Sequence, residues 1–522
     1  MLNCFAIFAK MLVNNNKKQE KIINLFFNHI FYLIMKKIFL LIILTLAAFG
    51  VYGQRHVWRS VSAGDATTYA LRDDGTLWTC GWNEKGQLGV PSAPERTATW
   101  QLTGNDTDWD LCKGAKAYAF FIKKDGTLWA VGSNTSGVQG TGRAVDNKTV
   151  VQVGTDDDWA SIAAVRFWGY TALAIKKNGS LWGWGNNASY LMGDGTTESH
   201  SKPVQIGTDT NWKSVSIGMD HVLALKTDGS LWSWGNSYNG QLGLGNVSLQ
   251  TSPKQVGADK DWAAVYAIDN RSYAVKADGS LWVCGSNEYG LLGLNQSESD
   301  LVQSYDEFIR NDSVSKLGKV LKVTGDENAT TSLIGNDGVG SAVYMVGSDM
   351  DGALGDGKGK LFSSTVASSD IVRSYVLVKP ILPEGLRIKS ISSGQGYSML
   401  VTDDGTMYGW GRNKGGQMGE NSDLEMLVTS FYKKPIVIDC PQTQISGITD
   451  VSLTPSEVLF AGNKLVANEL VSNLCIYSVM GSKVVCINQL QGSTDLSELT
   501  AGMYVAVYEI NGLTKSIKFV VK

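Results

Sequence analysis

Residues that could carry out chemistry are few in this chain, and those present stand at repeated positions. Histidine occurs only four times in 522 residues, and a catalytic or zinc centre needs several convergent side chains. His221 occupies a position that other copies of a repeat fill with Thr67, Tyr118, Thr171, Arg271 and Tyr397. A position that accepts such different types is a packing position. We therefore expect His221 to be buried inside a structural unit, and we predict no catalytic residue, cofactor or metal.

Acidic clusters form a second set of reactive groups. They precede tryptophans at Asp106-Thr107-Asp108, Asp156-Asp157-Asp158, Asp209 and Asp259-Lys260-Asp261. Converging carboxylates can bind calcium, but no calcium loop of recognised spacing occurs, so solvated turns between strands are the favoured interpretation. The glycine-rich loops lack the Lys-Ser/Thr of a phosphate-binding loop. Residues 54–440 contain no Gly-x-Ser-x-Gly nucleophile elbow in a strand-to-helix setting.

Regularly spaced glycines reveal the elements that carry these residues. An aromatic residue stands three places before a glycine in seven copies: Trp78/Gly81, Trp129/Gly132, Trp182/Gly185, Trp232/Gly235, Trp282/Gly285, Tyr344/Gly347 and Tyr408/Gly411. Another glycine follows each anchor eight places later: Gly89, Gly140, Gly193, Gly243, Gly293, Gly355 and Gly419. We expect these glycines to adopt positive φ or to lie where a Cβ would clash. An Asp-Gly or Asn-Gly pair precedes each aromatic strand and predicts a hairpin turn.

Each unit of about 50 residues therefore predicts strands joined by tight turns and a glycine-rich loop. We predict an all-β fold: a seven-bladed β-propeller of four-stranded blades over 54–440, a linker at 441–449, and a small β-sandwich-like domain. An open solenoid is the alternative, but it needs polar capping repeats, and neither end of the array has that character. Cys80 and Cys284 fill a position held by tryptophan elsewhere, so we expect them to be buried hydrophobes.

One stretch carries the repeat in full, from Gly218-Met-Asp-His221 through Asp228-Gly229-Ser-Leu-Trp232 to Gly240-Gln-Leu-Gly243. It resembles the regulator-of-chromosome-condensation repeat, and the resemblance covers roughly 56–440. The resemblance implies a seven-bladed propeller. The eukaryotic namesake of the family drives nucleotide exchange on a small GTPase at chromatin, and a secreted bacterial inhibitor of β-lactamases also resembles this propeller.

The N-terminal sequence predicts export. Met35-Lys36-Lys37 is followed by the apolar run Ile38–Phe49 and by Val51-Tyr52-Gly53, a pattern typical of a signal peptide over 35–53. The run is shorter than a membrane span needs. Residues 1–34 fit an upstream extension from a start codon called too early. We expect a protein that is secreted or on the outer surface of a Gram-negative bacterium.

The C-terminal residues have a different composition. They contain Tyr477-Ser-Val-Met-Gly481, then Asp495-Leu-Ser-Glu-Leu499-Thr-Ala-Gly502-Met-Tyr504, and end in a basic β segment. This resembles the C-terminal sorting domain of the type IX secretion system over 450–522. The resemblance implies passage through that machinery, followed by cleavage or surface attachment; an adhesion module is the alternative. Cys475 and Cys486 flank a strand turn, and an exported context permits a bridge between them.

The variable parts of the repeat supply the candidate binding residues. Aromatic side chains in the glycine-rich loops are Trp82, Tyr190, Tyr238 and Tyr289. Extra residues at Asn295–Lys319 include Tyr305, Phe308 and Arg310, which are favoured types at contact hot spots; a second insertion lies at Asp356–Gly385. We predict a non-catalytic protein that binds a protein or glycan. A net charge of −3 argues against nucleic acid. An enzyme acting on glycan or peptide at the channel mouth, and a guanine-nucleotide exchange factor, are the alternatives.

Overall fold

The chain divides into two compact units, residues 1–441 and 442–522. The computed structural model describes residues 56–165, 169–326, 330–336, 341–360, 372–419 and 431–441, and in the second unit 458–461, 464–478, 483–496, 499, 502–510 and 513–521. The predicted upstream extension 1–34, the signal peptide 35–53 and the linker after residue 441 lie outside the described residues. Within these ranges, no helix has the length and apolar character that crossing a membrane requires.

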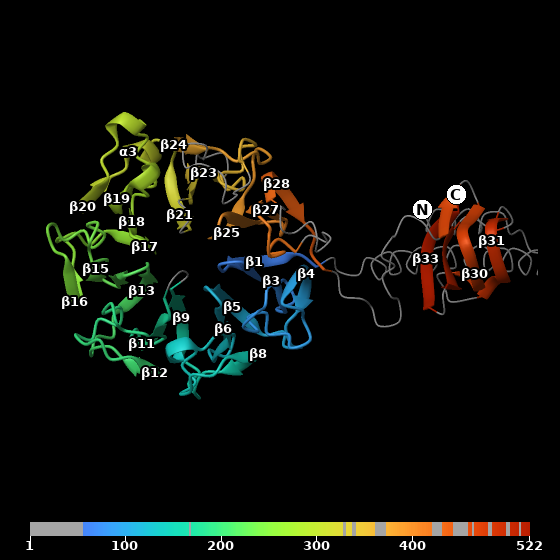
Figure 1. Ribbon diagram of the computed structural model, residues 1–522, viewed down its shortest axis with the longest axis horizontal. Coiled ribbons are helices and arrows are strands. Elements are labelled where there is room, and N and C mark those ends of the chain that lie inside the picture. Colours follow the sequence, from blue (N-terminus) through green and yellow to red (C-terminus); the bar gives the residue numbers. More distant parts are fainter. Residues whose placement is uncertain are drawn as a thin grey trace, which may run out of the picture. The chain divides into compact units, whose positions relative to one another are not determined.

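Seven four-stranded antiparallel sheets make up the described part of the first unit, and they form a ring (Figure 1). Blade 1 contains β1 (Trp58–Ala63), β2 (Thr67–Arg72), β3 (Leu77–Trp82) and β4 (Arg96–Leu102). Blade 2 contains β5 (Trp109–Gly114), β6 (Tyr118–Lys123), β7 (Leu128–Gly132) and β8 (Asn147–Gln152). Blade 3 contains β9 (Trp159–Ala164), β10 (Thr171–Lys176), β11 (Leu181–Gly185) and β12 (His200–Gln205). Blade 4 contains β13 (Trp212–Ile217), β14 (His221–Lys226), β15 (Leu231–Asn236) and β16 (Leu249–Gln255).

The remaining blades repeat this order. Blade 5 contains β17 (Trp262–Ile268), β18 (Arg271–Lys276), β19 (Leu281–Ser286) and β20 (Ser304–Arg310). Blade 6 contains β21 (Lys319–Gly325), β22 (Thr330–Asn336), β23 (Ser341–Ser348) and β24 (Arg373–Val378). Blade 7 contains β25 (Ile388–Gly394), β26 (Tyr397–Thr402), β27 (Met407–Arg412) and β28 (Phe431–Ile438). Short helices are η1 (Thr135–Gly137), η2 (Glu288–Gly290), η3 (Glu298–Asp300) and α3 (Asp312–Ser315). The predicted all-β fold with seven four-stranded blades is confirmed.

The Asp-Gly turns fix the hairpin between the second and third strands of a blade. In blade 4, Gly229 has φ +80°, and Asp228 Oδ1 accepts from Ser230 N at 3.0 Å and from Ser230 Oγ at 2.6 Å. Such local side-chain bonds are the reason that Asp initiates turns. Ser230 Oγ in turn accepts from Trp232 Nε1 at 2.9 Å. The same relay to a tryptophan occurs at Thr76, Thr127, Ser180 and Ser280.

The glycine eight places after each anchor lies against the next blade. Trp234 Nε1 donates to Leu191 O at 2.8 Å, and a Cβ on Gly193 would lie 2.8 Å from that nitrogen. Gly193 also has φ +71°. The indoles of Trp184 and Trp410 donate in the same way to Val138 O and Ala353 O, beside Gly140 and Gly355. Positive φ and close approach, both predicted from the repeat, occur together at this position.

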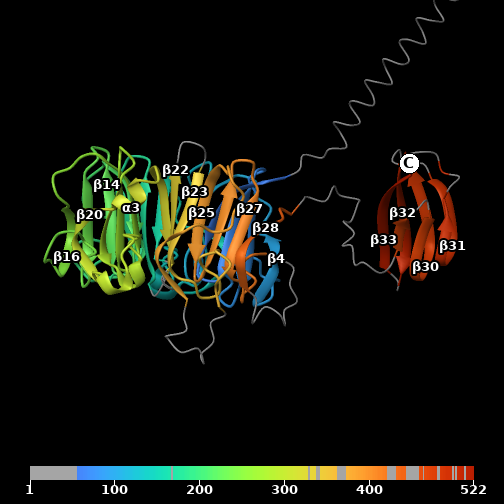
Figure 2. The ribbon, with the colours of Figure 1, turned by 90° about the horizontal axis from the view of Figure 1, so that it is seen from above.

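Serine hydroxyl groups join the innermost strands of neighbouring blades around the ring. Ser62 Oγ accepts from Gly114 N in the next blade at 2.9 Å, and Ser216 Oγ accepts from Ala267 N at 2.9 Å. The ring closes in the same way, because Ser392 Oγ in blade 7 accepts from Ala63 N in blade 1 at 3.0 Å. Closure therefore rests on contacts between two complete blades. Figure 2 shows the ring edge-on, with its strands running through its thickness.

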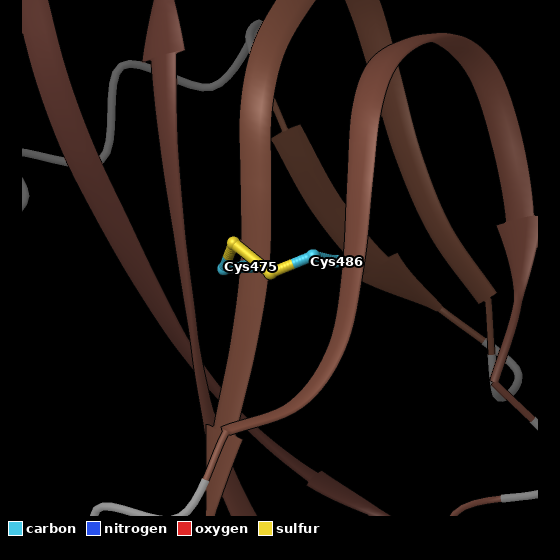
Figure 3. The surroundings of a disulfide bond; sticks show 2 residues. All are labelled: Cys475 and Cys486. Carbon is cyan, nitrogen blue, oxygen red and sulfur yellow. A yellow bond between two sulfur atoms is a disulfide. The ribbon is translucent and has the colours of Figure 1, made fainter.

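The second unit is one five-stranded antiparallel sheet with its own buried cluster. Its strands are β29 (Val458–Ala461), β30 (Lys464–Ser478), β31 (Lys483–Asp495), β32 (Gly502–Ile510) and β33 (Leu513–Val521). Val471, Leu474, Ile476, Tyr504 and Tyr508 form much of the cluster. Cys475 on β30 and Cys486 on β31 are register partners joined by a disulfide (Figure 3).

Gly193 and Gly207 have similar positive φ values, but an added Cβ would clash only at Gly193. Substituting each one therefore separates the free-energy cost of the clash from that of the backbone conformation. Gly193→Ala places a methyl against Trp234, whereas Gly207 has φ +63° with nothing within 4 Å of an added Cβ. We expect Gly207→Ala to lower the free energy of unfolding by about 1–2 kcal/mol through left-handed strain alone. Gly193→Ala adds overpacking, for a total larger by about 1–3 kcal/mol. Urea denaturation of both variants measures the difference; equal losses would show that the tryptophan contact is not tight.

Candidate functional site

The described residues of the loops between the third and fourth strands of the seven blades form what we call the loop rim. Each loop starts where a third strand ends and lies against the fourth strand of the following blade. A Cβ on Gly137 would meet Ser201 of β12, one on Gly240 would meet Asp306 of β20, and one on Gly416 would meet Ala98 of β4. Because all the blades repeat one orientation, the loop rim lies on a single face of the ring. Loops that a rigid scaffold positions often carry binding residues.

Trp82 lies at the junction between the first and last blades. A Cβ on Gly415 of blade 7 would lie 2.2 Å from the Trp82 ring, and the Arg96 guanidinium carbon lies 4.8 Å from its centroid. The Trp82 side chain is half-buried. This predicted binding residue therefore contributes to ring closure.

Tyr190, Tyr238 and Tyr289 all lie on the loop rim, in three successive blades, but they differ in exposure. Tyr190 and Tyr289 are half-buried and have φ of 58° and 57°, a conformation that is uncommon for bulky residues. The Tyr289 ring lies under the Arg373 guanidinium, 4.4 Å from the centroid. Tyr238 is 77 % exposed. Tyr238 is therefore the predicted rim aromatic that is most available to a partner.

Tyr305, Phe308 and Arg310 belong to the outer strand β20, and not to an inserted loop. Tyr305 OH accepts from Gln296 Nε2 at 3.1 Å. Phe308 packs on Trp262 with 5.9 Å between centroids, and a Cβ on Gly243 would lie 2.4 Å from its ring. In other blades a tryptophan stands at the position of Cys284 and its ring fills this space. In blade 5 the cysteine is too small, and Phe308 fills the space instead.

Arg310 is the exposed member of this group on β20. Its Nη1 pairs with Asp312 Oδ1 at 3.4 Å, and both side chains are more than half exposed. The structure therefore brings Tyr305, Phe308 and Arg310 onto one strand, where the two aromatic side chains support the blade and the arginine faces solvent.

The acidic clusters surround lysines that the sequence analysis did not single out. Lys176 Nζ lies 2.7 Å from Asp156 Oδ2 and 2.9 Å from Asp158 Oδ1. It also lies 4.9 Å and 4.7 Å from the ring centroids of Trp159 and Trp182. Partial burial lowers the pKa of this ammonium, but the hydrogen bonds to the two carboxylates outweigh that effect and raise the pKa above its ordinary value.

Equivalent lysines are Lys123, Lys226 and Lys276. The carboxylates of the acidic clusters are half-exposed, as expected for solvated turns. The positive charge that they surround is that of a lysine side chain of the same blade. The sequence signal was present: each lysine stands two places before its Asp-Gly or Asn-Gly turn.

The central channel is a cavity of about 500 Å³ lined by the first strands of the seven blades. Polar side chains along it include Asp110, Lys113, Asp269 and Lys322. Burial raises the pKa of the Cys112 thiol, also in the lining, to about 12, despite the opposing charge of Arg59. Cys112 therefore stays protonated near neutral pH and is a poor nucleophile.

One group of three potential metal ligands occurs among the described residues, at His56, Asp73 and Asp74. His56 Nδ1 lies 2.8 Å from Asp73 Oδ1. Asp74 is engaged by Arg72, whose guanidinium is almost fully buried. Partial burial opposes ionisation, but hydrogen bonds from Arg72 and Thr76 hold the pKa of Asp74 well below its usual range. An arginine thus already neutralises this carboxylate.

His221 is fully buried between blades 4 and 5. Ser272 Oγ donates to Gln241 O at 2.6 Å, so it accepts from His221 Nε2 at 2.8 Å, which fixes the neutral tautomer. Nδ1 has no hydrogen-bond partner among the described residues. Burial, with a contribution from the Arg271 charge, lowers the pKa of His221 to about 3. The expected packing role agrees with this environment.

The repeats, the closed ring and the loop rim define a propeller of the regulator-of-chromosome-condensation type. Residues 114–454 match the family model described as RCC1-like domain, and residues 58–87 match the regulator of chromosome condensation (RCC1) repeat. The protein belongs to the RCC1-like domain family.

Two relatives from Arabidopsis thaliana match parts of the chain. The Ultraviolet-B receptor UVR8 is 26% identical over 144 residues, which are 27% of this chain and 32% of that protein. The mitochondrial RCC1 domain-containing protein RUG3 is 27% identical over 179 residues, which are 31% of this chain and 39% of that protein. The chain therefore spans about a third of the length of these relatives.

Solved structures agree on the fold. Prp20p from Saccharomyces cerevisiae has a TM-score of 0.57 at 18% identity, covering 74% of this chain and 88% of its own. Human WBSCR16 has a TM-score of 0.56 at 20% identity, covering 70% of this chain and 94% of its own. At these identities the likeness is one of fold, and activity does not follow from it.

Acid should weaken the protein through His221. His221 is protonated below about pH 6.5 in the unfolded chain, but only below about pH 3 in the native protein. The free energy of unfolding therefore falls across that interval as the pH is lowered. His221→Thr, which adopts the residue of two other copies, removes this contribution. Between pH 7 and pH 4 we expect the wild type to lose about 3 kcal/mol more than the variant. Denaturant titrations at both pH values measure this; parallel losses would contradict it.

Proposed function

We propose that this protein is a secreted or surface-attached, non-catalytic binding protein that holds a protein partner on its loop rim. The exposure of Tyr238 carries the proposal, because 77 % of a large aromatic side chain faces solvent. Hydrogen bonds hold the backbone on both sides of Tyr238: Ser237 N donates to Ser248 O at 2.8 Å and Asn239 N donates to Gln241 Oε1 at 2.8 Å. Tyrosine on a fixed backbone gives contact area at little entropic cost and is enriched at binding hot spots.

A non-catalytic role is supported by the state of the reactive groups. Cys112 in the channel lining has a pKa raised by burial, and His221 is neutral and buried. Catalysis needs an accessible base or nucleophile with a pKa near the working pH. Neither group meets that requirement among the described residues.

A protein partner, in preference to a glycan, is supported by proteins of the same fold. Yeast Prp20p binds Gsp1p and histones, and it has also been solved with Kap60 bound. The fold thus presents protein-binding surfaces elsewhere. We do not extend nucleotide exchange to this chain, because the predicted export would separate it from a cytoplasmic GTPase.

Export is supported by three features. Residues 35–53 have the pattern of a signal peptide. The disulfide between Cys475 and Cys486 is of a kind that persists in oxidising compartments. The second unit has its own sheet and core, as a separable module requires. We propose that residues 450–522 serve as a type IX secretion sorting domain that delivers the propeller to the outside.

The termini and thiols of protein recovered from the culture medium test the export route. We expect mass spectrometry to find Gln54 as the first residue and the region 450–522 cleaved or attached to the surface. In chain that retains this region, alkylation before reduction should leave Cys475 and Cys486 unmodified and label Cys80, Cys112, Cys284 and Cys440 after denaturation. Protein that stays in the cytoplasm with residues 1–53 intact would contradict the proposal.

A pair of surface variants tests the loop rim. We expect Tyr238→Ser to weaken capture of the partner by about tenfold or more, because a hot-spot aromatic contributes about 2 kcal/mol. Val437→Ser on β28, where valine is 54 % exposed, is the matched control and should bind as the wild type does. The measurement is saturable binding of extracellular and envelope proteins to immobilised protein. Equal binding by both variants, or binding that survives proteolysis of the extract but not periodate, would contradict a protein partner at this rim.

A further inference from the structure

The loop rim is organised by one buried amide in most blades. The residue two places after the anchor glycine is Asn83, Asn134, Asn187, Asn287 or Asn413 in five blades. Its Oδ1 accepts from the backbone N–H five residues later at 2.9–3.1 Å. In blade 3 the other end of the amide, Asn187 Nδ2, donates to Asp194 Oδ1 at 3.1 Å and to Thr196 O at 2.9 Å. The amide thus needs both an acceptor and a donor.

Blade 6 has a carboxylate where these blades have the amide. Asp349 Oδ1 accepts from Leu354 N at 2.9 Å, as the asparagines do. Its Oδ2 takes the place of the donating nitrogen and has no hydrogen-bond partner among the described residues. Asp349 is only 1 % exposed. Seven residues later, where blade 3 has Asp194, blade 6 has Asp356. Asp349 and Asp356 interact with each other, so two carboxylates meet where an amide meets a carboxylate in blade 3.

This arrangement cannot persist as two bare anions. Burial raises the pKa of Asp349 to about 7, and so do the charge of Asp356 and the hydrogen bond that protonated Asp349 makes with it, although the Leu354 N–H and the Lys358 charge oppose the shift. A buried carboxylate oxygen without a donor is costly. A proton or a bound cation between the two carboxylates therefore replaces the missing amide hydrogens.

We propose that the loop 349–360 binds a divalent cation, calcium in preference to magnesium, between the carboxylates of Asp349 and Asp356. The converging groups are oxygens, which both ions require, and the loop turns at Gly352, Gly355 and Gly357 with φ of 75°, 68° and 90°. Calcium accepts carboxylates and carbonyls in irregular geometry, whereas magnesium demands a strict octahedron.

Neighbouring charges define the site further. Asp351 is not a ligand, because its Oδ2 pairs with Arg412 Nε at 2.8 Å. Lys358 Nζ lies 3.1 Å from Asp356 Oδ2 and its side chain is 71 % exposed, so it competes with the cation and can swing into solvent. The site also lies at a blade junction, since Trp410 of blade 7 donates to Ala353 O at 3.0 Å. Cation binding should therefore stabilise the contact between blades 6 and 7.

Calorimetry and thermal unfolding of the full mature protein test the site, after chelation and dialysis. We expect one calcium ion per chain, and an increase in Tm of about 3 °C or more at calcium far above its Kd. Asp349→Asn restores the amide of the other blades, so it should fold, bind no calcium and lose the shift. Lys358→Gln should tighten binding severalfold. Affinity should fall as pH drops below 7, because protons compete for Asp349.

A gain-of-site variant provides the matched control. Asn187→Asp recreates the carboxylate pair with Asp194 in blade 3 and should raise the stoichiometry to two. Asn287→Asp adds an aspartate at the same loop position in blade 5, where Leu294 stands seven residues later, and should leave the stoichiometry at one. The same heat and Tm shift in wild type and Asp349→Asn would overturn the proposal. A second result would also overturn it: calcium does not change the Tm of the wild type, but the wild type loses stability relative to Asp349→Asn as the pH rises from 5 to 8. In that case a proton on Asp349 takes the place of the cation.

Discussion

The whole structure depends on the contact between one blade and the next. A twisted four-stranded sheet has two apolar faces, and a single blade of this chain covers neither of them. The packing of Trp234 on Gly193 shows how the contact is made. The indole lies against a backbone that lacks a side chain, and its N–H donates to the carbonyl of Leu191. Ring closure through Ser392 and Ala63 applies the same logic to the ends of the array. A rigid face of loops follows from these contacts, whatever the loops bind.

Substitutions within the repeat show how the contact is preserved when its central residue changes. Blade 1 has Cys80 in place of the tryptophan, and Trp100 from β4 fills the space beside Gly419. Blade 5 has Cys284, and Phe308 from β20 fills the space beside Gly243. In both cases an aromatic side chain from the fourth strand occupies the space beside the glycine. This explains why the fourth strand of blade 5 carries an aromatic that looks like a contact residue when only its type is considered.

The glycine spacings were enough to predict seven blades, their turns and their positive φ values, because these are local requirements repeated along the chain. They were not enough to place Phe308, because its partner Gly243 is far away in sequence and the length of the insertion hid strand β20. The acidic clusters were also incompletely understood. Asp156 and Asp158 are solvated as expected, yet their shared lysine, Lys176, lies about twenty residues away at the end of β10, the second strand of the blade. Pairings across strands depend on register, which composition does not reveal.

Departures from the repeat fall into two kinds, and the distinction separates support from function. Some departures come with a partner that completes them: His221 has Ser272, and Cys284 has Phe308. His221 Nδ1 has no hydrogen-bond partner among the described residues, but the ring is neutral and leaves no buried charge to compensate. Others have no completing partner among the described residues: Tyr238 exposes an aromatic ring to water, and Asp349 buries a carboxylate oxygen against another acid. An exposed aromatic ring or a buried acid that the chain itself does not complete is where a ligand supplies the missing half.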